Sequence, residues 1–201
     1  MKAVMLSLRP QWCKLIFSGE KTIEVRKTAP KLETPFKVYV YCTKAKNIRE
    51  DGLYLLPNDK ELYLGCKEKD LGFVCWEGDF RNGKVIGSFV CDKVYKIVPD
   101  GEYYSNGYDI DDDMLSETCL GRGYLTGYGL GYTLYGWHIS DLKIYDKPRE
   151  LGEFVKPCDW NYDCCTCKRA VYELTKAEAK LFYGCDREIT RPPQSWCYVE
   201  A

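Results

Sequence analysis

Three charged side chains close together in the sequence are the first candidates for chemistry: Lys21, Glu24 and Arg26. Alternation along a strand places Glu24 and Arg26 on the same face, and Lys21 lies where the chain changes direction before that strand. Lysine and arginine bind phosphate groups, and the arginine plane also stacks on bases. The spacing therefore predicts a charged cleft that binds nucleic acid. A Glu24–Arg26 pair that only stabilises the strand is the open alternative.

The run from Gly19 to Arg26 fits the pattern Gly-x-Lys-x-x-Glu-x-Arg, which resembles the signature of the ASCH family. The context is similar too, because a Ser-x-Arg-Pro helix start precedes it at residues 7–10 and a strand-like run follows at 36–42. The resemblance covers residues 1–45 well and extends more loosely to about residue 145. The chain as a whole also resembles phage and prophage ASCH-domain proteins.

ASCH domains are relatives of the PUA fold, so the resemblance implies an α+β protein with a PUA-like, mostly antiparallel β-barrel. It also implies a binding module for RNA or a modified nucleobase, with its cleft at the motif. Further nucleic-acid contacts are predicted at Arg9, Trp12 and Trp137, the tryptophans as surfaces for an unpaired base. Each tryptophan is also a credible core residue.

Catalysis is the alternative that the same resemblance raises. Some small ASCH proteins are amidohydrolases acting on acetylcytidine, and their motif has a catalytic lysine and threonine. Lys21 matches that lysine, but Glu24 stands at the threonine position and Thr22 lies nearer the strand start. An amidohydrolase of acylated nucleosides would therefore use Lys21 as base and Glu24 as the second acid or base. A phage adaptor that binds a host protein through a tyrosine-rich loop is a third hypothesis.

The charge distribution is uneven along the chain. Residues 1–49 carry 11 Lys and Arg against three acidic residues, whereas the remaining 152 residues carry 18 basic and 27 acidic side chains. This asymmetry predicts a basic surface for phosphate, or two halves that attract each other electrostatically. His138 is the only histidine, so any Ser-His or Cys-His catalytic pair would need it. Its neighbours, Trp137 and Ile139, favour a half-buried structural residue instead.

Cysteines concentrate near the C-terminal end. Five of the twelve lie between residues 158 and 185. Without an export signal we expect a cytoplasmic location, where cysteines are thiols or metal ligands before they are disulfides. A Cys-x-x-Cys pair with flanking cysteines predicts one structural zinc, and plain buried thiols are the alternative. The predicted ligands are Cys158, Cys164, Cys167 and Cys185.

Hydrophobic patterns predict the elements that position these residues. Proline in the first turn and an apolar face indicate a helix at 9–18, packed on the barrel. Residues 44–70 are polar and predict a loop or loose hairpin, and a short helix is expected at 148–154. Strands are expected at 3–8, 21–27, 35–43, 71–76, 84–91, 94–98 and 137–145.

The chain divides into three predicted parts. Residues 1–150 form the ASCH-like barrel, and 100–136 make a long loop over its mouth, with a short helix after Ser116. Residues 151–190 form the cysteine-rich appendage, and 191–201 return as a strand. No apolar run approaches the roughly 18 residues of a membrane helix. The oligomeric state and the identity of the ligand stay open.

Overall fold

The computed structural model describes residues 2–44, 83–101, 107–157 and 187–200, together with the backbone of four short strands between residues 53 and 80. The short strands are β4 (Leu53–Leu55), β5 (Glu61–Tyr63), β6 (Cys75–Trp76) and β7 (Asp79–Phe80). The longer strands are β1 (Lys2–Leu8), β2 (Ile23–Arg26), β3 (Phe36–Cys42), β8 (Val85–Cys91), β9 (Val94–Ile97), β10 (Leu134–His138), β11 (Ser140–Arg149) and β12 (Trp196–Glu200). The helices are α1 (Pro10–Phe17), α2 (Asp112–Thr118) and α3 (Arg122–Gly129), with a 3₁₀ turn η2 at Leu151–Glu153.

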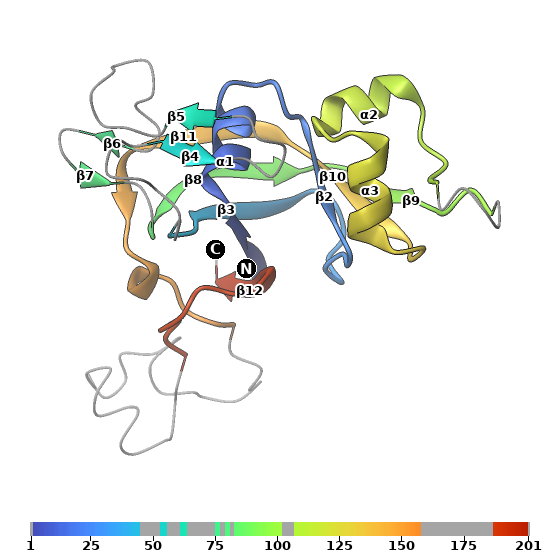
Figure 1. The fold of residues 1–201 in the computed structure, drawn as a ribbon. Helices are drawn as coiled ribbons and strands as arrows, with labels where there is room; N and C mark the ends of the chain where they lie inside the picture. The colour runs from blue at the N-terminus through green and yellow to red at the C-terminus, as the bar shows by residue number, and fades with distance from the viewer. Residues whose placement is uncertain are drawn as a thin grey trace, which may run out of the picture.

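A five-stranded sheet forms the centre of the fold (Figure 1). Its strand order is β11-β8-β3-β1-β12, and only the β1–β3 pair is parallel. One face packs against α1 and Trp137, and the other face packs against Phe154 and Ile189. Because β1 is covered on both faces, residues 3–6 form a continuous apolar run rather than an alternating one.

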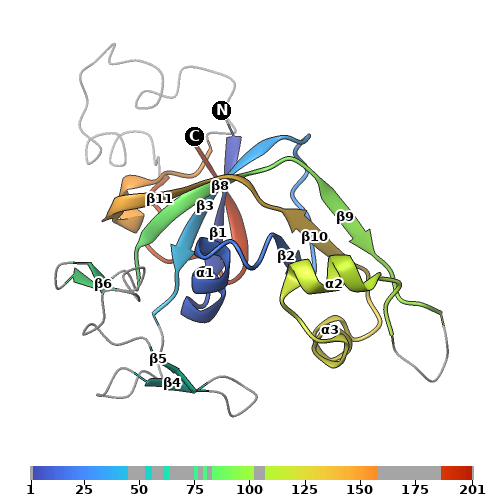
Figure 2. The ribbon, with the colours of Figure 1, turned by 90° about the horizontal axis from the view of Figure 1, so that it is seen from above.

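A three-stranded antiparallel sheet, in the order β2-β10-β9, carries the motif strand (Figure 2). The strand predicted at residues 137–145 is in fact two strands. β10 belongs to the three-stranded sheet and β11 to the five-stranded one, and only Ile139 separates them. The backbone just after this switch is strained, with Asp141 at a φ of +45°. The apolar positions change phase at the switch, from Trp137 and Ile139 to Leu142 and Ile144, and the prediction of a single strand overlooked this signal.

The α+β, mostly antiparallel class predicted from the sequence is confirmed. The closed barrel is not, because the strands in the described ranges hydrogen-bond into separate sheets and form no closed ring. The two larger sheets still share one core. Trp137 of β10 packs with the apolar face of the five-stranded sheet, in edge contact with Phe36 and Trp196.

The helix predicted at residues 9–18 is α1, and its start and end follow from its residues. Pro10 occupies the first turn, where no intrahelical N–H bond is lost. Cys13 and Ile16 are buried against the sheet. Gly19 follows the C-cap with a φ of +79°, a left-handed conformation that glycine adopts without strain. This turn sends the chain from α1 into the motif.

The segment predicted as a long loop with a helix after Ser116 contains two helices instead. α2 begins at Asp112, because the Asp111 carboxylate accepts the Met114 N–H at 2.7 Å and caps the helix. The acidic run at residues 109–113, which lies within the predicted loop, therefore contains the start of a helix. α3 was missed, because its glycine content lowers helix propensity. It is held by Leu125, buried against Val25 and Leu134 of the three-stranded sheet.

The remaining strand predictions agree with the structure wherever residues are described. β8 and β9 match the strands expected at 84–91 and 94–98, and β4 and β5 form an antiparallel hairpin within the predicted loose hairpin. The returning C-terminal strand is β12. The helix expected at 148–154 is only the turn η2. No helix in the described part of the chain is long and apolar enough to cross a bilayer.

Candidate functional site

A cleft of about 600 Å³ opens between α1, the start of the motif strand, α3 and the segment before β12. It contains the three charged residues predicted from the sequence. It also carries aromatic side chains from two helices and polar side chains from a segment near the C-terminal end. The lining residues used below are Ser7, Arg9, Trp12, Lys21, Glu24, Arg26, Lys27, Leu120, Tyr124, Tyr128, Gln194 and Ser195.

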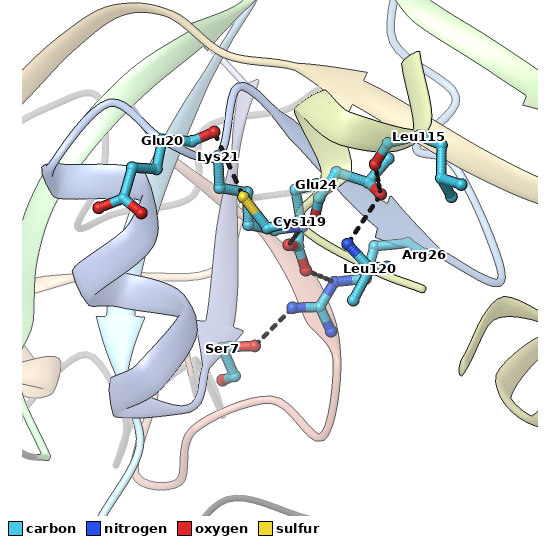
Figure 3. Close-up of polar contacts among 9 residues, drawn as sticks. Ser7, Glu20, Lys21, Glu24, Arg26, Leu115, Cys119 and Leu120 are labelled. Atoms are coloured by element: carbon cyan, nitrogen blue, oxygen red, sulfur yellow. Dashed lines mark hydrogen bonds and ion pairs between the residues drawn. The ribbon is translucent and has the colours of Figure 1, made fainter. Parts of the chain in front are cut away.

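The floor of the cleft is a charge cluster centred on Glu24 (Figure 3). Its carboxylate lies 2.9 Å from the Arg26 Nε and 3.4 Å from the Lys21 Nζ. All three side chains are largely buried, and Lys21 is only 2% exposed. A charge buried to this extent is tolerated only when it is paired, so the carboxylate and the two cations depend on one another. The predicted strand-face pair of Glu24 and Arg26 is confirmed.

The Lys21 ammonium has partners on three sides. It donates to the carbonyl oxygen of Thr118 at 2.5 Å, pairs with Glu24, and lies 5.4 Å from the centre of the Trp12 ring. Burial lowers the pKa of Lys21, and the nearby Glu24 carboxylate opposes this shift. The lysine is thus an internal cation that belongs to the protein framework.

Arg26 ties the motif strand to the central sheet. Its Nη2 donates to the Ser7 carbonyl at 2.8 Å, and its Nη1 donates to the Ser195 hydroxyl at 3.3 Å. A guanidinium has five N–H donors, so these bonds and the Glu24 pair leave two donors for a bound group. The buried Ser7 hydroxyl has no hydrogen-bond partner within the described ranges. The floor of the cleft therefore keeps hydrogen-bonding groups, on Arg26 and Ser7, that a ligand could use.

Aromatic rings form one wall. Trp12 of α1 meets Tyr124 of α3 edge-on at 6.0 Å, and Tyr124 stacks on Tyr128 with centroids 6.3 Å apart and planes at 22°. The Lys27 ammonium lies 5.1 Å from the centre of the Tyr128 ring. Burial raises the pKa of the Tyr128 phenol. Tyr124 is 40% exposed, so it presents aromatic surface at the opening.

The structure brings most of the predicted residues together. Lys21, Glu24 and Arg26 form the floor, and Arg9 and Trp12 line the same cleft. Trp137 was wrongly placed in the site: it is 0% exposed and packs in the core, so it offers no face to a ligand.

Other lining residues were missed by sequence reasoning. Tyr124 and Tyr128 are four residues apart on α3, a spacing that would have indicated a shared helix face had the helix been recognised. Gln194 and Ser195 come from the far end of the chain, and no local pattern links them to the motif.

Thr22 and His138 take structural positions outside the cleft. The Thr22 hydroxyl bonds the Glu117 carboxylate at 3.1 Å, and Thr22 is not among the lining residues. His138 Nδ1 lies 2.6 Å from the Asp92 carboxylate, and the ring is half-buried, as expected for a satisfied histidine. Neither residue can act as a nucleophile or base within this cleft as it stands.

The predicted zinc ligands, Cys158 to Cys185, lie outside the described residues, so the zinc site stays a prediction. A capping box at Thr175 and Glu178 also predicts a helix at 175–183, and this helix lies outside the described residues as well. Within the described ranges, no group of three or more His, Cys, Asp or Glu side chains is arranged to hold a metal ion.

Comparison with known proteins returns ASCH structures. No protein-family model matches the chain, and no curated protein matches it. The solved structures that it resembles include ASCH from Zymomonas mobilis, at 14% identity over 98% of this chain and 87% of that one, with a TM-score of 0.46. A serine-to-alanine variant of that protein matches at 14% identity over 98% of this chain and 88% of the variant's chain, with a TM-score of 0.47. These structural neighbours carry the family name that the motif predicted; the phage resemblance stays a prediction.

Proposed function

We propose that this protein binds RNA or a modified nucleobase in the cleft between α1 and α3. The observation that carries the proposal is the composition of the cleft. Four cations, Arg9, Lys21, Arg26 and Lys27, surround one carboxylate beside three aromatic rings. The lining therefore has a formal charge of +3 in a chain whose net charge is −1.

Each part of this lining suits one part of a nucleotide. Exposed aromatic surface stacks on bases, and base–aromatic stacking contributes about 1–3 kcal/mol per base. Arg9 and Lys27 are exposed at the rim, where they can bind phosphate. The free donors of Arg26 and the amide of Gln194 can bond a base edge.

Binding to labelled single-stranded RNA, single-stranded DNA and duplex DNA tests the proposal. We expect affinity for at least one of them to fall steeply with added salt, because phosphate contacts release counterions. Arg26→Ala should weaken binding. Lys147→Ala removes a charge on β11, which does not line the cleft, and serves as the control. Absence of binding to all three polymers at low salt would contradict the proposal.

An amidohydrolase of acylated nucleosides is the second candidate, and the lowered pKa of Lys21 favours it. In that reaction neutral Lys21 would act as base and Glu24 as the second acid or base. Incubation with acetylcytidine and detection of cytidine and acetate tests it. Turnover by the wild type would establish the enzyme; no turnover would leave the binding role.

A further inference from the structure

The Lys21 ammonium has three N–H donors and three partners inside the protein. The partners are the Thr118 carbonyl, the Glu24 carboxylate and the face of Trp12. An ammonium has no further donor, and this one is almost fully buried. A ligand could bond Lys21 only by displacing one of these partners. Arg26, in contrast, keeps two donors for a ligand.

The Thr118 contact is part of a continuous docking strip, which we define as residues 20–22 bonded to residues 117–119. The contacts run in antiparallel order: from the Cys119 thiol to the Glu20 carbonyl at 3.3 Å, from the Lys21 ammonium to the Thr118 carbonyl, and from the Thr22 N–H to the Glu117 carbonyl at 3.0 Å. The strip joins the start of the motif to the C-terminal end of α2. Lys21 supplies its one buried charge (Figure 3).

The docking strip determines where the aromatic wall lies. Leu120 follows it directly, and α3 then presents Tyr124 and Tyr128 to the cleft. Trp12 extends the same connection, since its ring contacts both the Lys21 ammonium and Tyr124. Lys21 is therefore the residue that links the Glu24 floor to the wall.

We propose that Lys21 is a positioning residue, which holds the wall of Tyr124 and Tyr128 against the floor and makes no contact with the ligand. This inference rests on the proposed binding function and refines it. The ligand is then contacted by Arg26, by the rim cations Arg9 and Lys27, and by the aromatic rings of the wall. The same geometry argues against Lys21 as a phosphate contact or as the base of a hydrolase.

Amide hydrogen exchange on the free protein gives the first test. Lys21→Met should speed exchange in α2 and α3 at least tenfold, because the docking strip loses its one buried charged contact. Lys147→Met, which removes an exposed cation of β11 outside the cleft, should leave that exchange unchanged. Unchanged protection in Lys21→Met would overturn the proposal. This measurement needs no ligand, so its result does not depend on the proposed binding function. Failure of the proposed function would show separately, as absence of oligonucleotide binding to the wild type.

The salt dependence of oligonucleotide binding gives the second test. Lys21→Met should weaken binding about tenfold with the slope of log K against log salt unchanged, whereas Lys27→Met should reduce that slope by about one. In a double-mutant cycle, Lys21→Met should add little to the loss caused by Tyr124→Ala, because both act through the same wall. Additive losses, or a slope reduced by about one in Lys21→Met, would overturn the proposal.

Lys21→Arg keeps a charged donor for Thr118 and Glu24, so we expect it to restore most of the protection and the affinity. If Lys21→Met does not fold, Lys21→Arg distinguishes a positioning role from a direct ligand contact. Normal exchange with tenfold weaker binding in Lys21→Arg would show a direct ligand contact and contradict the positioning role. Affinity that follows the protection of α2 and α3 would support it.

Discussion

Neutralising Glu24 tests the interdependence of the floor charges. Glu24→Gln preserves the shape and one acceptor but leaves the buried Lys21 and Arg26 cations without a counter-charge. Breaking a buried ion pair typically costs about 3–5 kcal/mol. Lys21 keeps Thr118 and Arg26 keeps the Ser7 carbonyl, so we expect the lower end, about 3 kcal/mol. For a chain of this size that corresponds to a fall in Tm of roughly 6–12 °C.

Urea unfolding, followed by far-UV circular dichroism, measures this loss. The matched control is Glu153→Gln, since Glu153 pairs with Arg149 at the same 2.9 Å but the two side chains are 46% and 41% exposed. An exposed pair contributes about 0–1 kcal/mol, so the control should change little. A Glu24→Gln variant within about 1 kcal/mol of the wild type, or no less stable than the control, would refute the reasoning.

Three further predictions concern α3, a buried thiol and the cysteine cluster. Gly127→Ala should stabilise the protein by about 0.5–1 kcal/mol, because a methyl group at that position of α3 meets open space. Gly129→Ala should destabilise it by about 1–3 kcal/mol, because the methyl group would overlap the Tyr108 hydroxyl. Urea unfolding of the two variants and the wild type measures both changes. Burial raises the pKa of Cys91 from 9.0 to about 12, so above pH 9 the unfolded chain binds fewer protons than the native one and stability falls as pH rises. Cys91→Ala should reduce the loss between pH 8 and pH 10 by about 1.4 kcal/mol, measured by unfolding at both pH values. Protein purified without added metal should contain about one equivalent of zinc bound by cysteines within residues 158–185, measured by elemental analysis.

Each of these has a clear contrary result. Effects of the same sign at both glycines would contradict the packing seen around α3. A wild type and Cys91→Ala that lose stability in parallel with pH would contradict the burial of that thiol. Less than about a tenth of an equivalent of zinc would end the metal hypothesis and favour buried thiols.

Local patterns predicted the central sheet and the floor of the cleft. The apolar run of β1, the proline start of α1 and the Gly19 turn are short-range signals, and together they place the motif after a helix and at the start of a strand. The pairing of Glu24 with Arg26 followed from strand alternation alone. These features need no knowledge of distant residues.

The wall of the cleft could not be predicted in the same way. α3 is rich in glycine and is stabilised by burial of Leu125 rather than by helix propensity, so tertiary packing decides its conformation. Ser195 reaches Arg26 across 169 positions of the sequence, and no periodicity encodes such a contact. Trp137 was misplaced because a strand pattern does not tell which side faces a core and which a ligand.

The pairing of β12 with β1 affects how the protein is synthesised. Lys2 pairs with Glu200, so the edge of β1 stays unpaired until almost the whole described chain has left the ribosome. An unpaired apolar strand edge is a template for aggregation, so a nascent chain can aggregate through β1 until β12 has been made. Ser195, whose hydroxyl accepts a hydrogen bond from Arg26, directly precedes β12. A chain that ends before this segment would therefore lack both the partner of β1 and the part of the cleft lining formed by Gln194 and Ser195.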